Sequence, residues 1–567
     1  MIIHSDGWKR GIASLDPLLQ VRIQWDVRIP LRDGVTLSAD LYRPKNDDLV
    51  PAIVIRTPYG KNTREMADQA RYFAERGYAV VAVDVRGRGD SDGLFAPYFG
   101  EGEDGYDVIE WVAKQPWCQG KVGTLGGSYL ARVQWLTALH KPPHLAAMVC
   151  LVSPSDPFVE WPTGVPTPHH LAWLFLTSGR VVQNVNAVDW DKVYWHLPLM
   201  TMDEAAGRPM SHWREEFLHT QIDEFWQRIS YQTRFSEIDL PVLHISGWYD
   251  DEQVGTLRNF SGMVKHAPTE RARRSQKLIM GPWEHAVNTR QRIGEVDFGP
   301  QSLIDLRGAE LRWFDYFLKG RDNGVVHEPP VSIFVMGRNV WREEREWPPA
   351  RATCAKFYLH SAGRANSLHG DGVLSAVRPE DEPADHYVYD PLRPVPFITG
   401  LTSTQIGGPD DYAAIERRDD VLVYTSEVLT EPLEVTGEIK VELYAATDAR
   451  DTDFTAKLVD VWPNGFAQRI ADGMVRARFR NGMHRQELVE PGQVCAYEID
   501  CWYTSHTFLQ GHAVRLEISS SAFPKYDRNP NTGEELGTTS VTRIARQTVY
   551  HDTNRPSALI LPIVPND

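Results

Sequence analysis

The first part of the chain alternates short apolar runs with longer amphipathic stretches. The apolar runs predict buried strands at Pro51–Arg56, Tyr78–Val85, Lys121–Leu125 and Leu145–Val152. The intervening segments predict helices at Ala67–Gly77, Asp104–Lys114 and Tyr129–His140. Nearly continuous apolar strands separated by helices are typical of a mostly parallel sheet covered on both faces.

This alternation stops after Ser153 and returns near residue 239. Residues 154–238 are rich in Trp, Pro, His and acidic groups, with helical patterns at Ser211–Thr220 and Ile222–Ile229. We interpret them as a helical cap inserted into the sheet domain. Two further strands, Pro241–Ser246 and Gln276–Met280, and a helix, Leu303–Leu318, are expected to complete the domain.

From about Ala350 the pattern changes to alternating strands separated by Gly, Pro, Asp and Asn turns. Predicted strands lie at Val421–Tyr424, Leu433–Thr447, Phe454–Val461, Gly492–Ile499 and Ala513–Ser519. This is typical of an antiparallel sandwich or jelly roll. A chain of 567 residues is too long for one core. We therefore expect an α/β core at 1–153 and 239–349, the cap at 154–238, and an all-β, galactose-binding-like jelly roll at 350–567.

Composition narrows the function classes. The formal net charge of −16 argues against a general nucleic-acid binder and against docking on anionic lipid. We expect a small-molecule substrate, no nucleic-acid partner and no membrane partner; a homo-oligomer stays open. No signal-peptide pattern or apolar run of transmembrane length is visible, and the five cysteines are scattered. These features predict a cytoplasmic protein.

The sharpest local motif is Gly126-Gly127-Ser128-Tyr129-Leu130, placed between a predicted strand and a predicted helix. A serine at such a bend is held with its hydroxyl exposed, and small neighbours are needed because the backbone is tight. The N–H of Tyr129, at the helix start, can donate to an oxyanion. Position 130 is Leu, so the second glycine of G-x-S-x-G is missing. The alternative is an ordinary Gly-Ser turn that caps a helix.

A nucleophilic serine needs a base, and the base needs an orienting acid. In α/β-hydrolases these follow later strands in the order Ser, Asp, His. Asp250 lies just past the strand Pro241–Ser246, and His285 just past Gln276–Met280. Each residue alone fits an ordinary loop position, but the ordered trio favours a catalytic triad. Asp251 is a rival for the acid.

A second oxyanion donor is expected after the first core strand, where Tyr59 could supply its phenol O–H. Without a triad, Tyr59 would be interpreted as a packing residue.

Two other patterns do not predict sites. Gly87-Arg88-Gly89 follows a strand, but Asp92 breaks the spacing of a dinucleotide loop. His169 and His170 are adjacent, so their side chains diverge and do not suit a metal pair. We expect neither a cofactor nor a metal.

Several longer motifs resemble those of a known family. The sequence resembles the CocE/NonD hydrolases, the family of cocaine esterase, α-amino-acid ester hydrolases and X-Pro dipeptidyl-peptidases. The matching stretches are RTPYGK at 56–61, VDVRGRGDSDG at 83–93, GGSYL at 126–130, GWYD at 247–250, GPWEH at 281–285, DTDFTAKLVDV at 451–461 and SSSAFPKYDRNPNTG at 519–533. This resemblance implies an α/β-hydrolase core, a helical cap and a jelly roll. It also implies a Ser128–His285–Asp250 triad, with the Tyr59 hydroxyl and the Tyr129 N–H as the oxyanion hole.

The resemblance leaves the substrate open. Relatives similar to cocaine esterase tend to carry an aromatic residue two positions after the acid, whereas α-amino-acid ester hydrolases carry acidic residues that pair with the substrate's amino group. Glu252 fits the second group, although the neutral Gln253 departs from it. Asp156 and Glu160 could complete an acidic cluster; the alternative is a solvated acidic loop.

The cap also supplies aromatic residues, Trp161, Trp173 and Trp195, which could line a substrate pocket or form the cap's own core.

The sequence leaves three alternative functions open. The first is a serine hydrolase of carboxylic esters, including α-amino-acid esters or β-lactam-type amides, acting through an acyl-enzyme on Ser128. The second is an X-Pro dipeptidyl-peptidase, and the third is a non-catalytic carbohydrate-binding protein.

Overall fold

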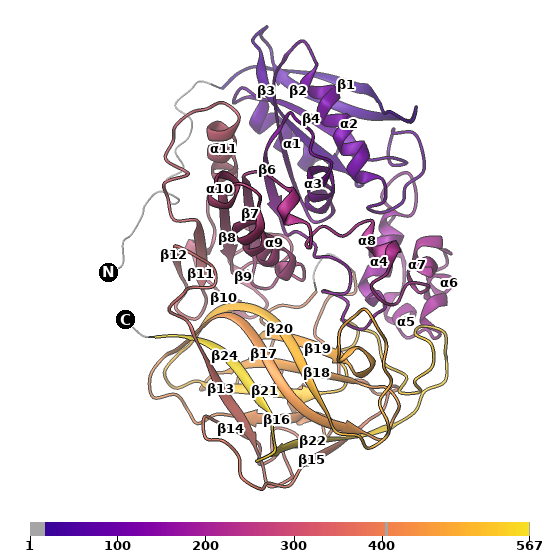
Figure 1. Ribbon diagram of the computed structural model, residues 1–567, viewed down its shortest axis with the longest axis vertical. Coiled ribbons are helices and arrows are strands. Elements are labelled where there is room, and N and C mark those ends of the chain that lie inside the picture. The colour runs from indigo at the N-terminus through magenta and orange to yellow at the C-terminus, as the bar shows by residue number, and fades with distance from the viewer. Residues whose placement is uncertain (1–17, 403–405, 566–567) are drawn as a thin grey trace.

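A ten-stranded sheet forms the core of the N-terminal part (Figure 1). The computed structural model describes residues 18–402 and 406–565. In spatial order the strands are β1 (Val21–Pro30), β2 (Thr36–Pro44), β4 (Ala79–Asp84), β3 (Val50–Thr57), β5 (Cys118–Gly127), β6 (Leu145–Leu151), β7 (Val242–Gly247), β8 (Gln276–Gly281), β11 (Val331–Val335) and β12 (Val340–Glu344). The stretch from β4 to β11 is parallel, and the edge strands β1, β2 and β12 pair antiparallel. The predicted α/β core is confirmed.

Helices cover both faces of this sheet. One hydrophobic cluster joins the sheet to α2 (Glu101–Ala113), α3 (Tyr129–Leu139), α9 (Gln253–His266) and α10 (Glu270–Arg274). Another joins the opposite face to α1 (Arg64–Ala74) and α11 (Leu306–Phe317). Burial on both faces explains why the central strands are apolar throughout: all eight residues of β3 are buried.

The segment between β6 and β7 is helical. It holds α4 (Pro168–Thr177), α5 (Trp190–Tyr194), α6 (Met202–Ala205), α7 (Ser211–Glu216) and α8 (Glu224–Gln227). These helices are shorter than the pattern predicts at 211–220 and 222–229. Their core includes Phe479, Phe523 and Leu536 from the C-terminal domain, so the cap packs directly on that domain.

The C-terminal domain is built from β-strands and lies at the opposite end of the molecule from β1 and β2 (Figure 1). Its strands are β13 (Thr353–His360), β14 (Val373–Ser375), β15 (Asp385–Tyr389), β16 (Leu422–Thr425), β17 (Leu433–Thr447), β18 (Asp453–Val461), β19 (Ala467–Arg476), β20 (Cys495–Phe508), β21 (Ala513–Ser519), β22 (Ala545–Asp552), β23 (Arg555–Pro556) and β24 (Ala558–Val564). Almost all pairings are antiparallel, with β14 and β16 parallel at one position. A short hairpin, β9 (Arg292–Ile293) and β10 (Val296–Asp297), precedes α11.

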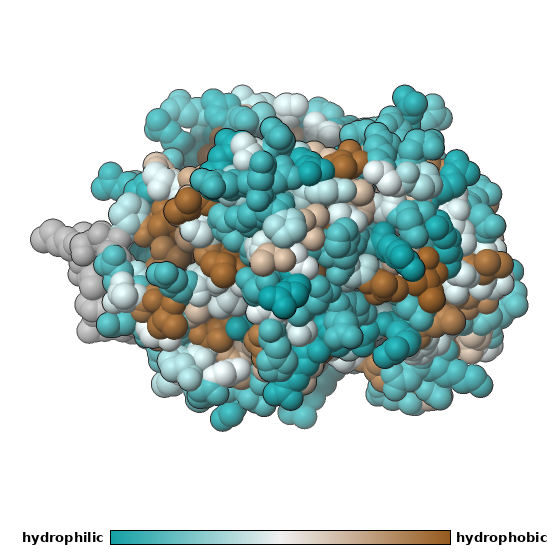
Figure 2. Space-filling model, turned by 90° about the horizontal axis from the view of Figure 1, so that it is seen from below, coloured by the Kyte–Doolittle hydropathy of each residue, from teal (hydrophilic) through white to brown (hydrophobic). Residues whose placement is uncertain are grey.

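The face formed by the C-terminal domain is mostly hydrophilic, with hydrophobic residues scattered across it (Figure 2). Among the residues described, no helix combines the length and the apolar character that a membrane span requires. All five cysteines are free thiols, and Cys354 is the exposed one.

Candidate active site

Ser128 sits in the bend between β5 and α3. Its φ of 59° and ψ of −127° lie outside the regions that ordinary residues favour. The bend is fixed because the Ser128 N–H donates to the carbonyl oxygens of Leu151 and Val152, each at 3.0 Å. A Cβ at Gly126 would lie 2.4 Å from the Cβ of Leu130, which explains the glycine two positions before the serine. Such backbone strain at the carboxyl edge of a parallel sheet is typical of a nucleophile elbow.

The loops after β7 and β8 are joined by backbone hydrogen bonds. The N–H of Trp248 donates to the Gly281 carbonyl, and the N–H of Tyr249 donates to the Trp283 carbonyl, both at 2.9 Å. The approach is so close that a Cβ at Gly247 would lie 2.1 Å from the Trp283 oxygen. These bonds hold the following residues of the two loops side by side.

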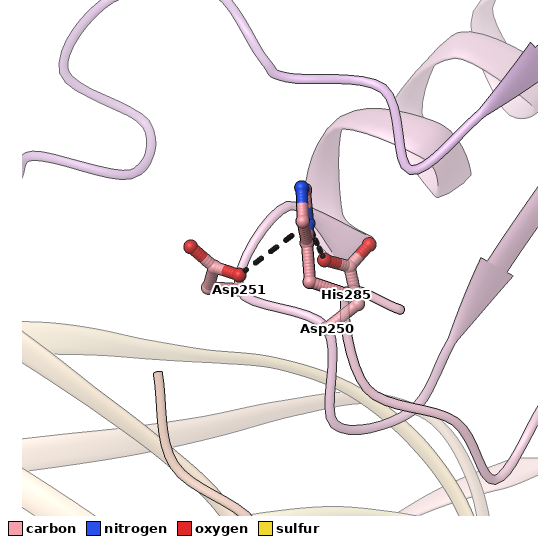
Figure 3. Close-up of side chains that lie close together, drawn as sticks. All are labelled: Asp250, Asp251 and His285. Atoms are coloured by element: carbon pink, nitrogen blue, oxygen red, sulfur yellow. Dashed lines mark hydrogen bonds and ion pairs between the residues drawn. The ribbon is translucent and has the colours of Figure 1, made fainter. Parts of the chain in front are cut away.

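Asp250 and His285 meet at this point (Figure 3). The Nδ1 of His285 lies 2.9 Å from Oδ1 of Asp250. The Asp250 side chain has no solvent exposure, and it accepts further bonds from the Ser246 hydroxyl at 2.6 Å and from the Glu252 N–H at 3.2 Å. These three contacts fix the orientation of the carboxylate. The other ring nitrogen of His285 points away from both aspartates (Figure 3).

Asp251 lies on the other side of the imidazole. Its Oδ1 is 3.7 Å from Nδ1 of His285, which is within ion-pair range but too long for a hydrogen bond. Ligand atoms of Asp250, Asp251 and His285 all lie within 4.8 Å of one another, a spacing that a metal ion could use. Because Nδ1 and the Asp250 carboxylate are already hydrogen-bonded, the arrangement also fits an orienting pair without a metal.

One cavity of about 470 Å³ brings these groups together, a typical size for a small-molecule site. The core, the cap and the C-terminal domain all contribute to its wall. From the predicted site it is lined by Ser128, His285, Tyr59, Glu252, Glu160 and Trp161. From the C-terminal domain it is lined by Ile406, Trp502, Lys525 and Tyr526, which the sequence did not point to because they lie more than one hundred residues beyond His285.

Tyr59 and Tyr129 flank the serine. The phenol oxygen of Tyr59 accepts a hydrogen bond from the indole N–H of Trp173 at 2.9 Å and lies beside the Ser128 hydroxyl. Burial raises the pKa of Tyr59 to about 12, so the phenol keeps its proton at neutral pH. Tyr129 is the first residue of α3, so its N–H has no partner inside the helix. Its hydroxyl donates to buried Glu101 at 2.7 Å, which anchors the residue.

Three carboxylic acids share the cavity. Burial raises the pKa of Glu160 to about 8 and that of Asp251 to about 6. Burial, reinforced by Glu160 and Asp251, also raises the pKa of Glu252 well above its ordinary range, although His285 opposes that shift. Oδ1 of Asp251 and Oε2 of Glu252 are buried and accept no hydrogen bond within the described part of the chain. His285 is nevertheless within ion-pair range of both, because its Nδ1 lies 3.7 Å from Oδ1 of Asp251 and 3.9 Å from Oε2 of Glu252.

Two cations also line the cavity, and both are engaged elsewhere. Arg132 donates to the backbone carbonyls of Ser155 and Ile229 at 2.8 and 3.1 Å, and Lys525 pairs with Asp472 at 2.5 Å. In the described ranges, neither is hydrogen-bonded to the three acids.

The structure does not bring every predicted residue to the cavity. Asp156 instead accepts from the backbone N–H groups of Tyr231 and Gln232, at 2.9 and 3.0 Å, so it shapes the loop at the start of the cap. Gln253, the departure noted in the sequence, begins α9 and donates to the Trp248 carbonyl at 2.8 Å. Trp195 packs on Phe523 and is 45% exposed, away from the cavity wall.

Comparison with known proteins identifies relatives of both parts of the chain. Residues 33–287 match the model of the X-Pro dipeptidyl-peptidase (S15 family), and residues 323–560 match that of the X-Pro dipeptidyl-peptidase C-terminal non-catalytic domain. Cocaine esterase from Rhodococcus sp. (strain MB1 Bresler) is 35% identical over 95% of this chain and 98% of its own length.

Two solved structures share the fold over nearly the whole chain. An α-amino acid ester hydrolase superposes with a TM-score of 0.84 and 25% identity, covering 99% of this chain and 100% of its own. An aminopeptidase from a marine sediment archaeon (Thaumarchaeota archaeon) gives a TM-score of 0.83 and 25% identity, with 96% of each chain covered.

Proposed function

The chain belongs to the CocE/NonD family of serine hydrolases, and on that premise we propose that it hydrolyses carboxylic esters whose acyl group carries a positively charged amine. Ser128, His285 and Asp250 act as its catalytic triad. The observation that carries the substrate proposal is the cluster of Glu160, Asp251 and Glu252 in the cavity that Ser128 lines.

The proposed reaction is acyl transfer. Ser128 Oγ attacks the ester carbonyl while Nε2 of His285 takes its proton. The Nδ1–H of His285 donates to Oδ1 of Asp250, and these two atoms are 2.9 Å apart. The Tyr59 hydroxyl and the Tyr129 N–H stabilise the negative oxygen of the tetrahedral intermediate. Collapse releases the alcohol with the proton from His285, and water, activated by the same imidazole, then hydrolyses the acyl-enzyme.

An ammonium group would suit the cluster electrostatically. Burial makes these carboxyl groups hold their protons, as the raised pKa values of Glu160 and Glu252 indicate, even though His285 lies within ion-pair range of Glu252. A bound ammonium adds a positive charge beside the three acids and donates up to three hydrogen bonds, so it favours the ionised carboxylates. A neutral acyl group of the same shape gains none of this.

The test compares p-nitrophenyl esters of phenylglycine, mandelic acid and phenylacetic acid, which carry an amine, a hydroxyl or neither on the same carbon. One charged hydrogen bond corresponds to roughly a 10- to 100-fold preference in kcat/KM for the amine. Glu252→Gln should remove most of that preference while hydrolysis of the phenylacetate ester continues. Glu65→Gln is the matched control, because it makes the same carboxyl-to-amide change in an exposed residue at the cavity wall.

Equal rates on the three esters, or an unchanged preference in Glu252→Gln, would contradict the amine site. An equal loss in Glu65→Gln would show that only the overall charge of the cavity matters. A peptidase of the X-Pro type would instead cleave an Ala-Pro p-nitroanilide faster than the phenylglycine ester, and that result would favour the alternative function.

A further inference from the structure

The cap supplies the hydrogen bond that fixes the direction of the Tyr59 hydroxyl. Trp173 lies on α4, and its indole N–H donates to the Tyr59 oxygen at 2.9 Å. Indole N–H is a donor only, whereas a phenol has one proton and can also accept. Tyr59 must therefore be the acceptor in this pair, and its own proton is left to point elsewhere. The neighbouring polar group is the hydroxyl of Ser128.

The indole itself is held in a stack of rings. Trp173 lies nearly parallel to Tyr98, with ring centroids 6.0 Å apart and planes 6° apart, and it also stacks on Tyr129 at 5.8 Å. It also stacks on His170 at 5.5 Å, and Nε2 of His170 lies 3.2 Å from a carboxylate oxygen of Glu216.

This stack connects the cap with both oxyanion residues. His170 and Trp173 are three residues apart on α4, so both lie on one face of the helix. Tyr129 begins α3 and Tyr59 follows β3, so both belong to the core. The position of α4 therefore decides where the indole N–H points relative to Tyr59.

We propose that Trp173 is a positioning residue for catalysis: its N–H turns the Tyr59 hydroxyl toward the oxyanion and couples the placement of the cap to the oxyanion hole. The inference rests on the proposed role of Tyr59 as an oxyanion donor. Accepting one hydrogen bond also makes a hydroxyl a stronger donor in the next. Both effects act on the tetrahedral intermediate and hardly at all on the bound ester.

Loss of the indole N–H should therefore lower kcat and leave KM nearly unchanged. The hydrogen bond between two neutral groups corresponds to roughly a 3- to 10-fold effect. Loss of the Tyr59 hydroxyl itself should be larger, about 10²–10³-fold, because it removes a whole oxyanion donor.

The experiment is a double-mutant cycle with Trp173→Phe and Tyr59→Phe, assayed on p-nitrophenyl phenylacetate so that no amine is involved. Inhibition by a boronic acid that adds to Ser128 is measured in parallel, because the tetrahedral adduct needs the same oxyanion donors. Trp173→Phe should weaken the boronate by the same factor as it lowers kcat. In the Tyr59→Phe background, Trp173→Phe should have no further effect on either.

Trp161→Phe is the matched control. Trp161 lines the same cavity and packs on His170 at 4.6 Å, but it is not bonded to Tyr59. Its effect should be the same in both backgrounds, because it does not act through that hydroxyl. Thermal melting checks folding, and Trp173→Leu, which also carries no hydrogen-bond donor, replaces Trp173→Phe in the cycle if the latter does not fold.

Additive effects of Trp173→Phe and Tyr59→Phe, or no loss in Trp173→Phe, would overturn the positioning role while leaving Tyr59 as a donor. Undiminished kcat in Tyr59→Phe alone would instead overturn the oxyanion role of Tyr59, and with it the role of Trp173.

Discussion

Replacing Asp250 with asparagine tests which of two adjacent aspartates orients His285. Both carboxylates face Nδ1, with oxygen–nitrogen distances of 2.9 Å for Asp250 and 3.7 Å for Asp251 (Figure 3). Charge alone does not separate them. With an effective dielectric constant of about 20, the attraction of a protonated imidazole is roughly 6 kcal/mol at the first distance and 4.5 kcal/mol at the second.

Hydrogen bonding does separate them. Asp250 receives three donors, from His285, Ser246 and the Glu252 N–H, and the first fixes the proton on Nδ1 so that Nε2 is free as a base. An asparagine offers one acceptor oxygen where three donors converge, and its amide can turn toward Nδ1 and favour the wrong tautomer. In serine proteases this change costs about 10⁴ in kcat, so we expect a loss of about 10³–10⁴ here. Asp251→Asn removes no hydrogen bond to the imidazole and should cost less than about 10-fold in kcat.

The pH dependence of activity gives a second measure of how Asp250 and Asp251 act on His285. Burial alone would lower the pKa of His285, but Glu252, Asp250 and Asp251 together raise it well above its ordinary range. The unprotonated imidazole is the base, so activity should rise with pH above the usual histidine range. Asp251→Asn removes one of those charges, so the rise in activity should move to lower pH.

The assay is initial rates of phenylacetate ester hydrolysis at several pH values for wild type, Asp250→Asn and Asp251→Asn. A larger loss in Asp251→Asn than in Asp250→Asn would refute the assignment of the acid. If activity rises at the same pH in Asp251→Asn as in wild type, the charge of Asp251 does not raise the pKa of His285.

Three further predictions concern the rest of the structure. Tyr59→Phe should lower kcat by about 10²–10³ with little change in KM, because only the oxyanion needs the phenol proton; an unchanged kcat in steady-state assays removes Tyr59 from the site. Gly247→Ala should lower both the melting temperature and kcat, since its Cβ would meet the Trp283 oxygen at 2.1 Å and push apart the loops that carry Asp250 and His285; a variant with wild-type melting and rates would contradict this. Burial raises the pKa of Glu310, on α11, from 4.5 to about 8, so its contribution to stability is full below pH 4.5 and is lost as pH rises through 8, by up to about 1.4 kcal/mol per pH unit. Glu310→Gln should therefore flatten the fall in melting temperature between pH 6 and 8, and an equally steep fall would show that Glu310 is not the cause.

The core could be predicted because its strands are buried on both faces. Strands such as β3, β4 and β6 then read as uninterrupted apolar runs, and the structure places them within two residues of the predicted bounds. The order of Ser128, Asp250 and His285 followed from the same rule, since each comes just after a strand and parallel strands end at one edge.

The cap was harder because its helices are only four to ten residues long, too short for a clear periodic pattern. The pattern at 211–220 predicts one helix, but α7 ends at Glu216 and Phe217 enters the cap core. Asp156 and Glu160 are both acidic residues near the start of the cap, and the local sequence pattern does not distinguish them. Only the folded loop shows that Asp156 accepts backbone N–H groups while Glu160 lines the cavity.

Contacts between distant segments were beyond any local signal. Lys525 and Tyr526 reach the cavity from the C-terminal domain, and Trp173 meets Tyr59 across 114 positions of sequence. Local pattern predicts which element a residue belongs to, but not which distant partner that element meets. Glu252 was recognised only because it lies two positions after the acid.

The most direct test of the whole account is the initial rate of p-nitrophenyl ester hydrolysis by wild type and by Ser128→Ala, measured side by side on the phenylglycine and phenylacetate esters. We expect measurable hydrolysis by the wild type and a loss of nearly all of it in the variant, because the acyl-enzyme can no longer form. Equal rates for the two proteins would contradict Ser128 as the nucleophile and, with it, the mechanism proposed for this cavity.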